Sequence, residues 1–162
     1  MKNDLLIESF NLDGERYNLY ETKDYLQFED LFVSSGLEFY LDETEEKVGG
    51  FVKGFSLKKA DGCLIGGSAL AVKEGHYVLN DLAVYKEHRG KDLGELLFKV
   101  SMEELKKMGA SSIYITAKVP EFFRKYGFYY LDLEDVPDIF SCKTCSQLNK
   151  TCHPKFMKYD CE

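Results

Sequence analysis

The 162-residue sequence contains no tryptophan and no long hydrophobic run. No apolar stretch approaches the roughly 20 residues that a membrane-spanning helix needs. The first ten residues, MKNDLLIESF, carry acidic side chains where a signal peptide needs an uninterrupted apolar segment. We therefore expect a cytoplasmic protein without a membrane partner.

The chain also lacks an excess of basic residues. It has 21 Lys and Arg against 28 Asp and Glu, which gives a formal net charge of −7. Proteins that bind nucleic acid usually carry a basic patch or stripe, because phosphates dominate that affinity. The basic residues here form only small clusters, so we expect no nucleic-acid partner.

Neither an internal repeat nor a low-complexity linker divides the chain. A length of 162 residues suits one domain with its own core. The hydrophobic content of 44% and the charged content of 30% are ordinary for a globular protein. We expect a single domain over residues 1–162, with residues 136–162 as a Cys-rich tail. The sequence leaves the oligomeric state open and allows a homodimer.

Hydrophobic periodicity predicts an antiparallel meander followed by a strand–helix–strand unit. The predicted strands are residues 16–21, 50–57, 63–73, 76–84, 112–117, 128–133 and 155–160. The predicted helices are residues 23–35 and 93–108, with a short helix that begins at Pro120. The crossover helix makes the strands on either side of it parallel. We therefore expect an α/β (α+β) fold with a mixed, mostly antiparallel sheet of about six or seven strands.

A basic loop that contains glycine lies between a predicted strand and the helix predicted at 93–108. It reads Arg89-Gly90-Lys91-Asp92-Leu93-Gly94. Main-chain N–H groups at a helix start are unsatisfied and lie at the positive end of the helix dipole, so they attract phosphate. The spacing matches neither a Walker loop nor the dinucleotide G-x-G-x-x-G pattern. The alternatives are thus a phosphate or pyrophosphate site and a plain strand–helix turn.

The order of these segments resembles the GNAT superfamily of acetyl-CoA-dependent N-acetyltransferases. The resemblance covers residues 50–131 well and residues 1–49 only loosely. The family's loop reads Arg/Gln-x-x-Gly-x-Gly/Ala. Arg89 and Gly94 match it, whereas Asp92 takes the place of the middle glycine. Asp tolerates a left-handed backbone better than most residues, at a cost of about 1 kcal/mol relative to Gly.

The resemblance implies acetyl-CoA as co-substrate. By resemblance, the main chain of residues 82–84 holds the pantetheine arm and polarises the thioester carbonyl, a role that needs no side chain. The cofactor-binding residues implied are Leu82, Ala83, Val84, Arg89, Gly90, Lys91, Asp92, Leu93, Gly94, Glu95 and Phe123.

A substrate amine would attack the thioester directly in a ternary complex, so a base or a chain of waters must take its proton. Asp81 is the first candidate base, and a solvent-facing carboxylate at a strand edge is its alternative reading. His76 begins the same strand and is the second candidate, with a surface role as the alternative. The tyrosine that many family members use as an acid falls at Phe123. Tyr126, one helical turn further on, is the candidate substitute, with packing as its alternative.

Thr116-Ala117 before the segment PEFFRKYGF is similar to the amino-acid N-acetyltransferases of arginine biosynthesis. Some small members continue with a Leu-Pro segment and a Cys-x-x-Cys-Pro…Cys tail. This chain has Val136-Pro137, and Ser146 stands at the usual proline. The resemblance implies a small-molecule amine or amino acid as acceptor without fixing which one.

Four cysteines crowd the last 21 residues: Cys142, Cys145, Cys152 and Cys161. The Cys-x-x-Cys spacing predicts a structural zinc site with these four ligands. A reversible Cys142–Cys145 disulfide and four reduced cysteines are the alternatives.

Two other functions compete with the enzyme. One is a CoA-binding regulatory or interaction module with degenerate catalysis, which Asp92 and Phe123 would explain. The other is a zinc-ribbon binding module in which the tail is the functional part.

Overall fold

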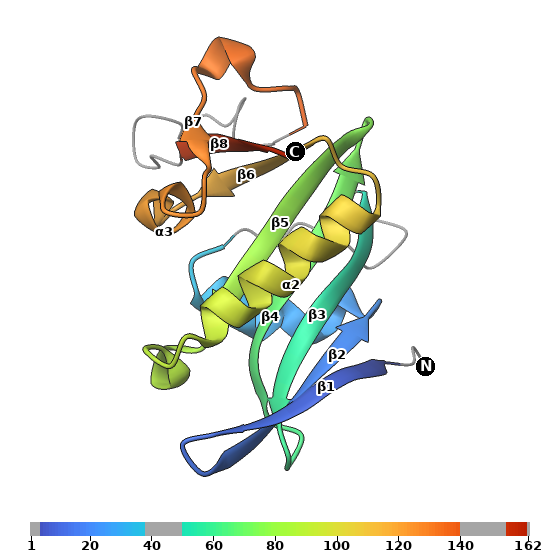
Figure 1. The fold of residues 1–162 in the computed structure, drawn as a ribbon, viewed down its shortest axis with the longest axis vertical. Helices are drawn as coiled ribbons and strands as arrows, with labels where there is room; N and C mark the ends of the chain where they lie inside the picture. The colour runs from blue at the N-terminus through green and yellow to red at the C-terminus, as the bar shows by residue number, and fades with distance from the viewer. Residues whose placement is uncertain (1–3, 38–49, 140–154, 162) are drawn as a thin grey trace.

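The computed structural model describes residues 4–37, 50–139 and 155–161, in which one sheet of eight strands forms the centre (Figure 1). The strands are β1 (Leu5–Leu12), β2 (Glu15–Thr22), β3 (Phe51–Lys59), β4 (Leu64–Lys73), β5 (His76–Val84), β6 (Ser112–Ala117), β7 (Tyr129–Tyr130) and β8 (Lys155–Asp160). Their order is β1-β2-β3-β4-β5-β6-β8-β7. Every neighbouring pair is antiparallel except β5–β6.

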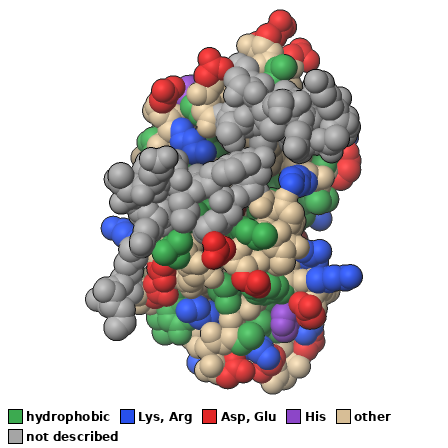
Figure 2. All heavy atoms as spheres, turned by 180° about the vertical axis from the view of Figure 1, so that it is seen from behind, with side chains coloured by type: hydrophobic (Ala, Val, Ile, Leu, Met, Phe, Trp, Pro, Cys, Tyr) green, Lys and Arg blue, Asp and Glu red, His purple; other side chains and the backbone are tan. Residues whose placement is uncertain are grey.

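Among the described residues, the longest helix is α2 (Leu93–Lys107), which crosses one face of the sheet, and the other helices are short. They are η1 (Tyr25–Phe28), α1 (Glu29–Ser34), η2 (Lys86–His88), α3 (Pro120–Arg124) and η3 (Leu133–Asp135). In the described part of the chain, no helix combines the length and apolarity that crossing a bilayer requires. Figure 2 shows Lys and Arg side chains dispersed among acidic and apolar ones over the described part of one face.

The predicted meander and the parallel strand–helix–strand unit are confirmed, and the sheet differs from prediction at its two edges. β1 was not predicted, because Leu5, Leu6 and Ile7 are consecutive apolar residues without the alternation of a half-buried strand. All three are exposed, at 60%, 52% and 46%, and the register of β1 shifts between Leu6 and Glu8. At the other edge, the strand predicted at 128–133 is only β7, because the chain turns into η3.

Two cores lie on opposite faces of the sheet. The core under α2 includes Leu97, Met102 and Leu105, with strand residues from β2 to β8. The core under η1 and α1 contains the aromatic residues Tyr25, Phe28, Phe32 and Phe51. The Phe28 ring lies so close to Gly67 of β4 that a Cβ there would overlap it. This close packing fixes η1 and α1 against the middle of the sheet.

A buried hydrogen bond joins α2 to the sheet and allows a stability prediction. The hydroxyls of Ser68 on β4 and Ser101 on α2 lie 2.7 Å apart, and both residues are fully buried. Ser101→Ala would leave the Ser68 hydroxyl buried without this partner, so we expect about 1–2 kcal/mol lower free energy of unfolding. Chemical denaturation measures this loss. Ser112→Ala, which removes an exposed bond to Asp160, is the matched control, and equal effects of the two variants would contradict the prediction.

Candidate active site

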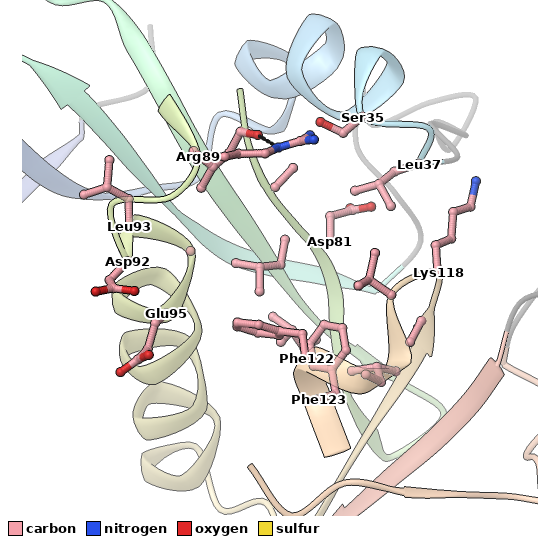
Figure 3. A pocket seen from close by; sticks show the side chains of 18 of the residues that line it. Ser35, Leu37, Asp81, Arg89, Asp92, Leu93, Glu95, Lys118, Phe122 and Phe123 are labelled. Carbon is pink, nitrogen blue, oxygen red and sulfur yellow. Dashed lines mark hydrogen bonds between the residues drawn. The ribbon is translucent and has the colours of Figure 1, made fainter. Parts of the chain in front are cut away.

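A cavity opens where β5 and β6 separate. The two strands pair only at Tyr77–Ile113 and Val78–Tyr114, although both continue for several residues beyond. The cavity has a volume of about 630 Å³. Its walls are the ends of β5 and β6, the start of α2, part of α3 and the chain that follows α1 (Figure 3). The splayed strands thus expose main-chain edges that a continuous sheet would pair.

A β-bulge in β5 lies at the start of this separation. Ala69 of β4 pairs with Asp81 and the next residue, Leu70, pairs with Leu79, so Asn80 is the extra residue. Bulges bend a strand and re-aim the side chains beside them. Here the bulge is followed by Asp81, whose side chain contacts Tyr25 on the α1 face of the sheet.

Asp81 combines burial with access to the cavity. The residue is 5% exposed and lies in the cavity wall. Its Oδ2 accepts hydrogen bonds from the Tyr25 hydroxyl at 3.0 Å and from the Asn80 amide nitrogen at 2.8 Å. Burial raises the pKa of Asp81 to about 6, against the opposing effects of these two bonds and of the Lys73 charge. Such a carboxylate is a stronger base than an exposed one and is still mostly ionised at neutral pH.

The main chain of β5 beyond the bulge directs alternate peptide groups into the cavity. The Tyr85 N–H donates to the Ile65 carbonyl of β4. In an antiparallel pair the main-chain groups of successive residues point alternately towards the partner strand and away from it. Ala83, two residues before Tyr85 and paired with Gly67, therefore also directs its N–H and carbonyl towards β4. Those of Leu82 and Val84 then face the opening towards β6. Of the three residues predicted to hold the pantetheine arm, Leu82 and Val84 therefore offer N–H groups and Ala83 offers its side chain.

The start of α2 forms the other end of the cavity. Its first intrahelical hydrogen bond runs from the Leu96 N–H to the Asp92 carbonyl at 3.1 Å. The N–H groups of Leu93, Gly94 and Glu95 therefore have no intrahelical acceptor and meet the positive end of the helix dipole. Asp92 has the left-handed backbone expected of a residue in a glycine position, with φ 61°. These features fit the predicted pyrophosphate site.

Basic residues of the loop before α2 have different positions. Arg89 lines the cavity, and its Nε donates to the Val84 carbonyl at 2.9 Å. Figure 3 shows its guanidinium pointing towards Ser35 rather than towards Asp92 and Glu95. Lys91 belongs to the same loop but does not form part of the cavity wall. Its predicted contact with the cofactor stays a prediction.

The aromatic segment brings Phe123, but not Tyr126, to the cavity wall, where Phe122 accompanies it. Tyr126 packs against Phe98, with 4.8 Å between the ring centroids. A hydrogen bond with Glu95 raises the pKa of the Tyr126 hydroxyl to about 12, so this group is a weak acid in the structure described. Its role as an acid stays a prediction.

The second candidate base lies outside the cavity wall. His76 begins β5 at the end away from the cavity, and its ring meets Tyr114 edge-on at 5.4 Å. The geometry thus favours Asp81 over His76.

Nothing in the sequence pointed to Tyr25, which bonds Asp81, or to Lys118 and Thr116, which line the cavity, as site residues. Tyr25 is 56 positions from Asp81, so no local pattern links them. Lys118, which follows β6, donates from Nζ to the Gly36 carbonyl and so joins the cavity's far wall to the end of α1. Thr116 was noted only for family resemblance. Its Oγ1 is buried and has no partner among the described residues, so this wall has a hydrogen-bonding group available to a ligand.

Three of the four predicted zinc ligands, Cys142, Cys145 and Cys152, lie outside the described residues. The fourth, Cys161, follows β8 and donates its main-chain N–H to the Ser111 carbonyl at 2.8 Å. Burial raises the pKa of the Cys161 thiol, which disfavours the thiolate that zinc requires. The zinc site stays a prediction.

Known proteins share the fold of this chain. Among solved structures, N-acetylglutamate synthase from Neisseria gonorrhoeae, complexed with coenzyme A and N-acetyl-glutamate, has a TM-score of 0.65 and 15% identity, over 99% of this chain and 35% of that one. Ard1 from Thermoplasma volcanium has a TM-score of 0.62 and 16% identity, over 90% and 98%. A GNAT-family acetyltransferase from Staphylococcus aureus Mu50 has a TM-score of 0.56 and 16% identity, over 68% of each chain.

At these identities the likeness shows the fold alone, and the chain spans only 35% of the length of the synthase. Comparison with curated proteins gives no match. The model of the acetyltransferase (GNAT) family, however, matches residues 4–129, which is most of the chain. The chain therefore belongs to the GNAT family of acetyltransferases, and its splayed β5 and β6 are part of the GNAT fold.

Proposed function

We propose that this protein transfers an acetyl group from acetyl-CoA to the amine of a small molecule or an amino acid, by direct attack in a ternary complex. The observation that carries the proposal is a buried carboxylate, Asp81, in the same cavity as unpaired main-chain donors and a free helix N-terminus. One solved structure of the same fold, that of N-acetylglutamate synthase, contains coenzyme A together with N-acetyl-glutamate, which supports this pairing of ligands.

Acetyl-CoA would lie with its pyrophosphate at the start of α2 and its thioester between β5 and β6. Leu93, Gly94 and Glu95 offer N–H groups to the pyrophosphate, at a helix end where negative charge is stabilised. The carboxylates of Asp92 and Glu95 oppose this attraction. Lys99 offsets one of them, because its Nζ lies 2.7 Å from Glu95 Oε1. The Thr116 hydroxyl has no partner among the described residues and lies in the cavity wall, where it could bond an amide group of the pantetheine arm.

In the proposed reaction, Leu82 and Val84 offer fixed N–H donors to the thioester oxygen as negative charge develops on it. Asp81 takes a proton from the acceptor amine as the new C–N bond forms and the C–S bond breaks. The thiolate of CoA is a fair leaving group, so a weak acid or water suffices to protonate it. The acceptor enters from the side that Ser35, Leu37 and Lys118 enclose, where Figure 3 shows Asp81 facing them.

Thiol release from acetyl-CoA tests this function. We expect turnover with at least one member of a panel of amines and amino acids, and mass spectrometry of the product should show one added acetyl group. Tight binding of CoA without turnover on any amine would instead support the alternative, a CoA-binding module. The carboxylates of Asp92 and Glu95 and the presence of Phe123 in place of an acid favour that alternative. Absence of CoA binding would reject both.

A further inference from the structure

The bulge residue Asn80 links the buried carboxylate to a lysine on the neighbouring strand. Its Oδ1 accepts a hydrogen bond from Lys73 Nζ at 2.8 Å, and its Nδ2 donates to Asp81 Oδ2 at 2.8 Å. The three side chains therefore form a chain of cation, amide and anion. Lys73 and Asn80 are 7 positions apart in the sequence and face each other across the β4–β5 hairpin.

Only one orientation of the Asn80 amide suits its two neighbours. The reverse orientation would set the amide oxygen against a carboxylate and the NH₂ group against an ammonium, with neither pair able to bond. Because the ammonium draws electron density towards the amide oxygen, it strengthens the donation from the NH₂ group to Asp81. Asn80 cannot titrate, so it passes on the influence of Lys73 without exchanging a proton itself.

Other groups also face Asp81. From η1, the Tyr25 hydroxyl donates to the same oxygen, Oδ2, at 3.0 Å. Across the cavity, Arg89 and Lys118 lie in the wall, but each donates to a main-chain carbonyl instead, at Val84 and Gly36. Lys73 is the cation whose charge acts on the Asp81 carboxylate. Oδ1 of Asp81 receives no hydrogen bond from any described residue, and Figure 3 shows the carboxyl inside the cavity.

We propose that Lys73 and Asn80 are positioning residues that keep Asp81 ionised and leave its Oδ1 free for the acceptor amine. This inference rests on the proposed function, in which Asp81 is the base. Burial alone would favour the protonated acid, which cannot accept a proton. Lys73, which is not part of the cavity wall, opposes that effect through Asn80, which lies in the wall beside Asp81 and bonds only its Oδ2, so Oδ1 stays open to the substrate.

The test compares three variants by two measurements. Lys73→Met removes the cation, Lys73→Arg keeps it, and Lys107→Met removes an exposed positive charge at the far end of α2. The carbon-13 resonance of the Asp81 carboxyl, followed by NMR against pH, reports its protonation without any substrate. The pH dependence of kcat/KM for acetyl transfer reports the same ionisation during catalysis.

We expect Lys73→Met to raise the Asp81 titration midpoint by about one pH unit, and the acidic limb of the kcat/KM profile with it. Lys73→Arg and Lys107→Met should leave both within a few tenths of a unit. A midpoint in Lys73→Met equal to that in Lys107→Met would overturn the inference. If the wild type acetylates no amine, the proposed function fails, and the NMR titration still decides whether Lys73 controls the ionisation of Asp81.

Discussion

Replacing Asp81 with Asn is expected to lower kcat/KM for acetyl transfer by about 100-fold or more while leaving the affinity for CoA unchanged. General bases contribute roughly 10²- to 10⁴-fold to rate, and Asn has the same shape but cannot accept a proton. The Asn oxygen could accept the bonds from Tyr25 and Asn80 that Asp81 Oδ2 accepts now. Steady-state kinetics gives the rate, and calorimetric titration with CoA gives the affinity.

The same substitution should stabilise the fold at neutral and alkaline pH. The pKa of Asp81 is raised from 3.8 to about 6 in the native state. Between these values the native protein holds a proton that the unfolded chain has lost. The stability from this group is therefore complete below about pH 4 and disappears as the pH rises through about 6. A difference of about two pK units corresponds to about 3 kcal/mol. Asn, which never ionises, avoids this loss.

Urea denaturation at pH 5 and pH 8 separates the two effects of this variant. The advantage of Asp81→Asn over the wild type should be larger at pH 8 than at pH 5. A variant that is inactive and also less stable at pH 8 would mean that the hydrogen bonds of the ionised carboxylate outweigh its burial. Full activity in a folded variant would exclude Asp81 as the base and return the role to water.

The central part of the fold followed from sequence because its signals are local. Alternation marks β3, β4 and β5, and the apolar stripe of α2 and the glycine after it mark a crossover helix. The edge strands of the sheet could not be predicted in the same way. The first half of β1 is exposed and only Phe10 and Leu12 pack partly against the core, so β1 lacks the sustained one-sided pattern on which strand prediction depends. Its partner β2 was predicted, because Tyr17 and Leu19 alternate with polar residues and are buried.

The candidate site followed from sequence only where neighbours along the chain create it. Asp81 and the loop at 89–94 could be chosen because each adjoins a recognisable strand or helix. The environment of Asp81 could not be foreseen, since Tyr25 and Lys73 reach it through folding across three elements. The one-turn spacing from Phe123 suggested Tyr126 as an acid, but it could not predict which residues surround the Tyr126 side chain. Its ring packs on Phe98 from α2, a contact that spacing within α3 cannot reveal.

Gly94→Trp is expected to lower the affinity for CoA by about 100-fold or more, which is about 2.7 kcal/mol of binding free energy. Gly94 lies in the first turn of α2, where its N–H faces the predicted pyrophosphate site. A Cβ at this position would approach only Val84 Cγ2, at 3.8 Å, so the protein itself leaves the space open. An indole would fill that space in the cavity wall and keep a phosphate away from the helix N-terminus. Calorimetric titration with CoA measures the loss.

Gly94→Ala is the matched control, because its methyl group makes only an ordinary contact with Val84. We expect it to bind CoA within a few-fold of the wild type, and both variants to unfold at nearly the wild-type temperature. Since the backbone at Gly94 does not need a positive φ, neither side chain strains the helix start. If the Trp variant is folded and binds CoA normally, the pyrophosphate does not lie at the start of α2. The unpaired N–H groups of Leu93 and Glu95 would then face only solvent, and the cavity between β5 and β6 would have to bind CoA in another orientation or bind a different ligand.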